Sequence, residues 1–115
     1  MIILYKTKPG DTIFKLLEQN NASFKEFEKM NDILNLKFIK HQMVLIPLSH
    51  NTSVQLYAYE TKESDTLNQL INTYQVTYEE IKYFNNLFHL ILTENQKIEI
   101  ENKVISPVAK EFEID

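Results

Sequence analysis

The chain repeats itself at a constant offset of 54 positions, and this repeat limits its possible folds more than any other feature. Many residues are identical at this offset, and apolar residues also recur at it in the positions between the identical pairs. One register kept without a gap over roughly 45 positions indicates two copies of one module. The identical pairs include Tyr5 with Tyr59, Thr7 with Thr61, Asp11 with Asp65, Thr12 with Thr66, Asn31 with Asn85, and Gln42 with Gln96.

The same elements are predicted in both copies. Each copy opens with an extended run rich in Ile, Tyr and Thr, at residues 2–8 and 56–62, as strands prefer. Apolar residues spaced i, i+3, i+4 then predict a first helix, and a capping-box pattern starts a second helix. A final strand closes each copy. The two capping boxes are Ser23-x-x-Glu26 and Thr77-x-x-Glu80, and the closing strands are residues 43–46 and 97–101.

This element order predicts an α+β fold made of two tandem βααβ modules. The two strands of each copy are expected to pair with each other as a two-stranded antiparallel sheet, with both helices on one face. The expected divisions are a first module at 1–48, a linker at 49–54, a second module at 55–102 and a C-terminal tail at 103–115.

Two residue pairs are predicted to cap the helices, one pair at helix starts and the other at helix ends. Asp11 and Asp65 precede the first helix of each copy, where a carboxylate can accept hydrogen bonds from free backbone N–H groups. Asn31 and Asn85 stand where the second helix ends, and asparagine tolerates the left-handed conformation that is common there.

Composition and charge exclude several functional classes. The net charge is −4 without any basic run, so nucleic acid is not an expected partner. The chain has no cysteine, and its three histidines are far apart, so neither a metal site nor a cofactor is expected. No stretch reaches the roughly 20 apolar residues of a spanning helix, so no membrane partner is expected.

The sequence predicts no enzyme and leaves the compartment open. Nothing in it suggests a pair of carboxylates poised for general acid and base catalysis, and it shows neither a nucleophile with a neighbouring base nor a phosphate-binding glycine loop. It shows no export signal. Association with a cell wall or spore surface is expected if the chain is a fragment or leaves the cell without such a signal, and a cytoplasmic location otherwise.

These motifs resemble the LysM family. The pattern of that family is an aromatic strand, a Gly-Asp-Thr turn, an apolar helix, a second helix that ends in Asn, then Gly-Gln and a final Ile-Pro. The resemblance covers about 90 residues. Copy one carries Tyr5, Gly10-Asp11-Thr12, Asn31, Gln42 and Ile46-Pro47. Copy two keeps Tyr59, Asp65-Thr66, Asn85, Gln96 and Ile100.

The resemblance implies non-catalytic binding of polymers that contain N-acetylglucosamine, such as peptidoglycan or chitin. In LysM modules the glycan lies between the turn before the first helix and the loop after the second. By this mapping, residues 10–13 face 32–39, and residues 64–67 face 86–93. The implied glycan-binding residues are Gly10, Asp11, Thr12, Ile13, Phe14, Asp32, Ile33, Leu34 and Phe38 in copy one, and Ser64, Asp65, Thr66, Leu67, Asn86, Leu87 and Phe88 in copy two.

Departures from the pattern favour copy one as the binding copy. Gly10 is the only glycine, and Ser64 replaces it in copy two. His41 and Asn95 stand where the family has the glycine before Gln. Losing glycine can reshape a groove where the backbone approaches a ligand. Phe14 is the main exposed-aromatic candidate, because it lies on an outward helix face and Asn68 replaces it in copy two.

A second hypothesis keeps the fold but changes the partner. LysM modules also occur in spore-coat assembly and in the tail or baseplate of phage-like particles, where they have structural or protein-binding roles. Modules this small bury little surface, so packing of the two copies together, or self-association, is also expected.

Overall fold

The computed structural model describes residues 1–50 and 53–103, without side-chain placement at 49, 50, 53 and 54. It is an α+β structure with short helices and small antiparallel sheets, as predicted. In chain order the elements are β1 (Ile2–Lys6), α1 (Ile13–Asn20), α2 (Phe24–Met30), η1 (Ile33–Asn35), β2 (Lys37–Phe38), β3 (Met43–His50), β4 (Ser53–Glu60), β5 (Asp65–Thr66), α3 (Leu67–Tyr74), α4 (Tyr78–Phe84), η2 (Leu87–His89) and β6 (Lys97–Glu101).

The strand pairing differs from the prediction. β1 pairs antiparallel with β6, with Leu4 opposite Glu99, and not with β3 of its own copy. β3 pairs instead with β4, from Met43 opposite Glu60 to His50 opposite Ser53. The prediction that each copy closes its own sheet was therefore wrong. The closing strands of the two copies are exchanged.

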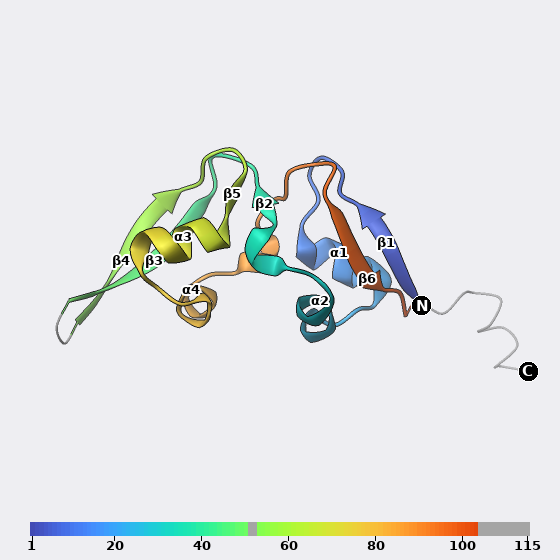
Figure 1. Ribbon diagram of the computed structural model, residues 1–115, viewed down its shortest axis with the longest axis horizontal. Helices are drawn as coiled ribbons and strands as arrows, with labels where there is room; N and C mark the ends of the chain where they lie inside the picture. The colour runs from blue at the N-terminus through green and yellow to red at the C-terminus, as the bar shows by residue number, and fades with distance from the viewer. Residues whose placement is uncertain (51–52, 104–115) are drawn as a thin grey trace, which may run out of the picture.

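Each folded unit consequently contains parts of both copies (Figure 1). We call β1, α1, α2, η2 and β6 the first unit, and β4, α3, α4, η1 and β3 the second unit. Packing of α2 on β6 and of α1 on η2 joins the first unit, while α4 packs on β3 and α3 on η1 in the second. The chain crosses between the units after Asn31 and again after Asn85. We call residues 32–42, which lead to β3, and residues 86–96, which lead to β6, the crossing segments.

The short connection between β3 and β4 gives a physical reason for the exchange. Only residues 51 and 52 separate the two strands, whose ladder has eight residue pairs. A hairpin closes with little loss of chain entropy, whereas pairing β1 with β3 closes a much longer loop. Within the predicted linker at 49–54, residues 49 and 50 belong to β3 and residues 53 and 54 to β4. The division of the chain at this linker stays a prediction. The predicted tail lies outside the described residues, except for Lys103.

One apolar cluster runs through both units. It confirms the helical spacing, since Ile13, Leu16 and Leu17 of α1 are buried. The core side chains least exposed to solvent include Phe27, Phe38, Ile46, Ile81, Leu92 and Ile100. Because Phe38 and Leu92 lie on the crossing segments, the two units share this core.

The asparagines after the second helices hold the exchanged strands. Asn31 Oδ1 accepts a hydrogen bond from the Glu99 backbone N–H, and its Nδ2 donates to the Glu99 carbonyl, both at 2.8 Å. Asn85 bonds both backbone groups of Leu45 in the same way. Their φ values are −125° and −137°, so the predicted left-handed ends were wrong. The amide ends the helix by turning to a strand edge, and this needs extended backbone.

A charged pair joins the two units at equivalent positions of the repeat. Glu28 lies at the position that Lys82 occupies in copy two, and the two side chains form an ion pair at 3.5 Å. The Tyr78 hydroxyl donates to Glu28 Oε2 at 2.5 Å. Burial and this carboxylate raise the pKa of Tyr78. Two identical copies would place like charges at this contact, so the pair favours association of copy one with copy two.

Candidate functional site

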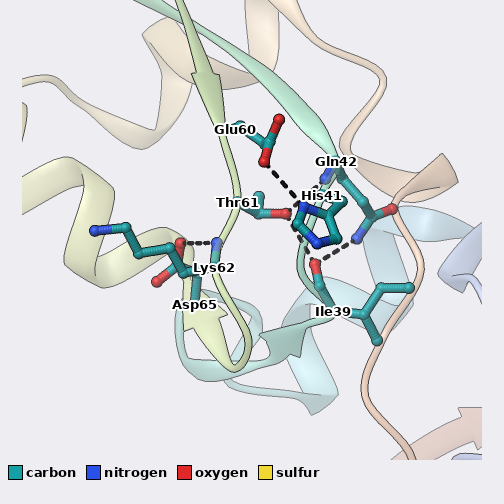
Figure 2. Close-up of polar contacts among 7 residues, drawn as sticks. All are labelled: Ile39, His41, Gln42, Glu60, Thr61, Lys62 and Asp65. Atoms are coloured by element: carbon teal, nitrogen blue, oxygen red, sulfur yellow. Dashed lines mark hydrogen bonds and ion pairs between the residues drawn. The ribbon is translucent and has the colours of Figure 1, made fainter.

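The two aspartates shape the turns before the first helices and do not cap them. Asp11 Oδ2 accepts hydrogen bonds from the Tyr5 hydroxyl at 2.7 Å and from the Lys8 backbone N–H at 2.8 Å. Asp65 bonds Tyr59 and Lys62 in the same way, and Figure 2 shows its bond to Lys62. The predicted capping role of both aspartates was wrong.

The caps are the threonines that follow. Thr12 Oγ1 accepts from the Lys15 N–H, and Thr66 forms a complete capping box with Gln69. The box predicted at Thr77 and Glu80 is confirmed. At Ser23 only the hydroxyl caps, because Glu26 pairs with Lys103 Nζ at 2.7 Å.

Four positions where the family has glycine have a left-handed backbone, although three of them hold another residue here. Gly10 has φ +86°, and Ser64 adopts +67° at the equivalent place. His41 and Asn95 have φ values of +68° and +69°. Non-glycine residues pay a modest strain there. The substitutions therefore leave the backbone conformation in place and add side chains along it.

Two glutamines tie the crossing segments of the two copies together. Gln42 Nε2 donates to the carbonyls of Ile39 and Ile91, and Gln42 Oε1 accepts from the Ile91 N–H at 2.7 Å. Gln96 makes the matching bonds to Lys37 and Thr93. Each glutamine thus joins a segment of its own copy to one of the other copy.

Buried threonines anchor the same region to the strands. Thr61 Oγ1 donates to the Ile39 carbonyl at 2.8 Å and accepts from the Gln42 N–H at 2.9 Å (Figure 2). Thr7 makes the equivalent bonds to Thr93 and Gln96. Threonine and glutamine together hold the crossing backbones in a fixed position between the two turns.

A hollow of about 380 Å³ opens between the turns and the crossing segments. We call this cavity the central hollow. Gly10 comes from the turn of copy one and Ser64 from the turn of copy two. The residues that line it are Pro9, Gly10, Ile39, Glu63, Ser64, Ile91, Leu92, Thr93 and Glu94. Both copies therefore contribute to one cleft.

The structure brings together different segments from those predicted. The turn at 10–13 faces 91–92 of copy two, since Thr12 bridges to Ile91 and the Leu92 N–H donates to the Asp11 carbonyl. The turn at 64–67 faces 37–38 of copy one, where Lys37 pairs with Thr66. The facing segments inside each copy were wrong because the loops after the second helices are exchanged along with the strands.

Exposure divides the predicted site residues into two groups. Gly10, Phe14, Asp32, Ser64 and Asn86 are exposed. Several others belong to the core, so they support the site from below; these are Thr12, Ile13, Ile33, Phe38, Thr66, Leu67 and Leu87. Asp11, Leu34, Asp65 and Phe88 are partly buried.

Prediction from the sequence missed part of the central hollow. Pro9, Glu63 and Glu94 line it without having been predicted. Ile39 and residues 91–93 belong to loops that were predicted to line a site, but each loop was expected to face the turn of its own copy. No motif marks Glu63 or Glu94, and only the structure shows that both line the same hollow.

Phe14 is exposed, as its position on the outer helix face predicted. Its side chain is 43% exposed and stacks on His89 of η2, with ring centroids 4.4 Å apart and an interplanar angle of 27°. The stack joins α1 of copy one to η2 of copy two. Its equivalents in the second unit, Asn68 and Asn35, are not aromatic.

The tyrosines that bind the turn aspartates have raised pKa values. The hydrogen bond to Asp11, together with burial, raises the pKa of Tyr5 to about 12. Burial and the bond to Asp65 raise the pKa of Tyr59 to about 12. The ordinary pKa is about 10, so the folded state holds these protons more tightly than the unfolded state. Their contribution to stability is present below pH 10 and is lost as the pH rises towards 12.

We therefore expect alkaline destabilisation that depends on these hydroxyls. Tyr5→Phe and Tyr59→Phe are expected to lower stability at neutral pH and to flatten its decline above pH 10. Ultraviolet titration of the phenols together with thermal melts at each pH would measure this. Tyr83→Phe is the control, since the Tyr83 side chain is 82% exposed. Equal pH profiles for all three variants would contradict the account.

Within residues 1–50 and 53–103, no group of three or more His, Asp or Glu side chains is placed to hold a metal ion. Over the same residues, none of the helices has the length and apolar character needed to cross a membrane.

Comparison with known proteins identifies the modules. The model of the LysM domain matches the chain twice, at residues 5–46 and 59–100. N-acetylmuramoyl-L-alanine amidase sle1 of Staphylococcus saprophyticus is 23% identical over 107 residues. That match covers 89% of this chain but only 33% of the amidase. No solved structure matches the chain. Two LysM matches that cover most of the chain show that it belongs to the LysM domain family.

Proposed function

We propose that this chain is a non-catalytic module that binds the N-acetylglucosamine-containing glycan of peptidoglycan in the central hollow. Membership of the LysM family supports glycan binding in general. The name of the amidase relative refers to the bond between N-acetylmuramic acid and L-alanine, which is peptidoglycan chemistry. The chain spans a third of that relative, so amidase activity is not proposed for it.

The observation that carries the proposal is that both turns and both crossing segments meet at one hollow. Ile39 and Ile91, which are partly exposed, provide apolar contact for an acetamide methyl and for the C–H face of a sugar ring, while the buried Leu92 supports them from below. Ser64 and Thr93 add hydroxyl groups that can bond sugar hydroxyls. The units are thus expected to share one glycan strand.

The charges at the rim indicate which sugars suit the hollow. Glu63 and Glu94 both line it, and among residues 1–50 and 53–103 no basic side chain does. Carboxylates accept hydrogen bonds from sugar hydroxyls and repel anionic groups. We therefore expect binding of neutral N-acetylglucosamine oligomers in preference to sugars that carry sulfate or phosphate.

Ile91→Asp is expected to weaken binding to purified peptidoglycan at least tenfold. The change places a charge on the apolar side of the hollow, where contact with the sugar would leave it without water. Co-sedimentation over a range of peptidoglycan concentrations would measure the loss. Leu56→Asp is the matched control, because Leu56 is exposed on β4 and does not line the hollow.

Two outcomes would contradict the proposal. If Ile91→Asp folds and pellets as the unchanged chain does, the glycan does not lie in the central hollow. If the unchanged chain fails to pellet at any salt concentration, glycan binding itself is wrong, and the alternative of a protein-binding LysM module takes its place.

A further inference from the structure

A second cleft in the second unit is lined by three clustered tyrosines. Tyr57 and Tyr59 of β4 lie against Tyr74 of α3, with ring centroids 5.7 and 6.0 Å from that of Tyr74. Two adjoining hollows of about 590 and 350 Å³ both contain Tyr59, Tyr74 and Lys62 in their walls. We call this surface the tyrosine cleft.

The rings are available to a ligand. Tyr57 is 45% exposed, whereas Tyr59 and Tyr74 are partly buried and the Tyr59 hydroxyl is held by Asp65 at 2.6 Å. Such rings lose little conformational freedom on binding, and they offer flat apolar faces beside polar hydroxyls. A pyranose ring has the same character, since its C–H faces are apolar and its edge carries hydroxyls.

Polar groups beside the rings suit a sugar better than a wholly apolar ligand. Gln69 and Thr73 of α3 line the smaller hollow, and they offer amide and hydroxyl groups for hydrogen bonds. Charges in the larger hollow have both signs, with Lys40 and Lys62 beside Glu60 and Glu63. His41 Nδ1 pairs with Glu60 at 2.9 Å (Figure 2). This mixture favours a neutral polar ligand.

The tyrosine cleft adjoins the central hollow. Glu63 lines both the larger tyrosine hollow and the central hollow, while Ser64, the next residue, lines the central hollow alone. A linear polymer that occupies the central hollow can therefore continue past Glu63 onto the rings. A compact ligand would fill only one of the two.

The first unit lacks the equivalent surface. Residues 54 positions before the three tyrosines are Ile3, Tyr5 and Asn20, so one ring remains of three. The Lys103 backbone N–H also donates to the carbonyl of Asn20, so residue 103 lies next to the residue that is equivalent to Tyr74. The cleft is therefore a feature of one end of the molecule.

We propose that the tyrosine cleft is an additional carbohydrate subsite, which binds further sugars of a neutral N-acetylated glycan strand whose other part occupies the central hollow. This rests on the function proposed above. It gives the bound strand a direction, from the central hollow towards the second unit, and makes affinity depend on strand length.

The test is a calorimetric titration of the full chain with chitin oligomers of increasing length, from chitobiose to chitooctaose. The unchanged chain is expected to bind long oligomers more tightly than short ones. Tyr57→Ala and Tyr74→Ala are expected to weaken binding of the longest oligomer about tenfold, as truncation of a contact aromatic commonly does. Their affinity for short oligomers should stay the same.

Ile3→Ala is the matched control, because it alters the position in the first unit that is equivalent to Tyr57. It is expected to keep the full length dependence. Because the chain has no tryptophan, tyrosine fluorescence gives a second readout, which long oligomers should change through Tyr57. Melting curves would establish that each variant is folded; Tyr57→Phe, which keeps the ring, should restore binding.

The outcomes separate this proposal from the one before it. If folded Tyr57→Ala and Tyr74→Ala variants bind every oligomer as the unchanged chain does, the tyrosine subsite is wrong while binding in the central hollow stands. If both variants lose affinity for short and long oligomers alike, the strand does not begin in the central hollow, and the extension is also wrong. If the unchanged chain binds no oligomer, the glycan function fails together with the subsite.

Discussion

Asn85→Ala is expected to cost about 3 kcal/mol of stability, because it removes three hydrogen bonds worth about 1 kcal/mol each. Asn85 accepts from the Leu45 N–H and donates to the carbonyls of Leu45 and Ile81, each at 2.8 Å. The change leaves both backbone groups of Leu45 unpaired at the edge of β3. Thermal unfolding followed by circular dichroism should show a midpoint lowered by roughly 10–20 °C.

Two variants sharpen this measurement. Asn86→Ala changes the next residue, which is exposed and makes no side-chain cap, and it should alter stability by less than about 0.5 kcal/mol. Asn85→Asp keeps the acceptor for the Leu45 N–H but loses the donor, so an intermediate loss is expected. A loss for Asn85→Ala no greater than that for Asn86→Ala would contradict the role given to Asn85.

The repeat and its elements could be predicted from the sequence because they depend on local signals. The capping box at Thr77 and the apolar spacing at Ile13, Leu16 and Leu17 act within a few residues, and the structure confirms both. The helix-capping role predicted for Asp11 was wrong even though it rested on such a local signal. Its carboxylate lies one residue before the cap, and a bond to the Tyr5 hydroxyl draws it into the turn.

The exchange could not be predicted from the repeat, and the repeat itself is the reason. Asn31 bonds Glu99, while the equivalent residue in its own copy is Leu45. Glu99 and Leu45 offer the same backbone N–H and C=O groups at the same register, so the Asn31 side chain could make the same hydrogen bonds to either residue. The choice depends on chain connection, above all on the hairpin between β3 and β4.

The candidate site was predicted in part for the same reason. The turns at Gly10 and Ser64 line the central hollow, and the glycan-binding role that the LysM motifs imply for them stays a prediction. Their facing loops were assigned to the wrong copy, since Thr12 bridges to Ile91. The tyrosine cleft leaves no periodic signal, because Tyr57 and Tyr74 have no aromatic counterparts in copy one.

Cysteine cross-linking distinguishes the exchanged fold from the tandem fold. Leu4 lies opposite Glu99 across β1 and β6, and both side chains are exposed, so replacing them leaves the core intact. Directly opposed residues of antiparallel strands lie within disulfide reach. The chain has no cysteine of its own to compete. Leu4→Cys with Leu45→Cys is the matched alternative, because Leu45 holds the place of Glu99 in copy one.

We expect the chain with Leu4→Cys and Glu99→Cys to oxidise within a single molecule. The disulfide closes the loop from residue 4 to residue 99, and for a loop of that size the chain-entropy model gives a stabilisation of about 4.7 kcal/mol. Thiol counting, mass and non-reducing gels would follow oxidation at low protein concentration, and thermal melts would measure the gain. The chain with Leu4→Cys and Leu45→Cys should keep both thiols free. If instead that second pair oxidises readily and the first does not, each copy closes its own sheet, and the shared core and shared hollow described for this protein are wrong.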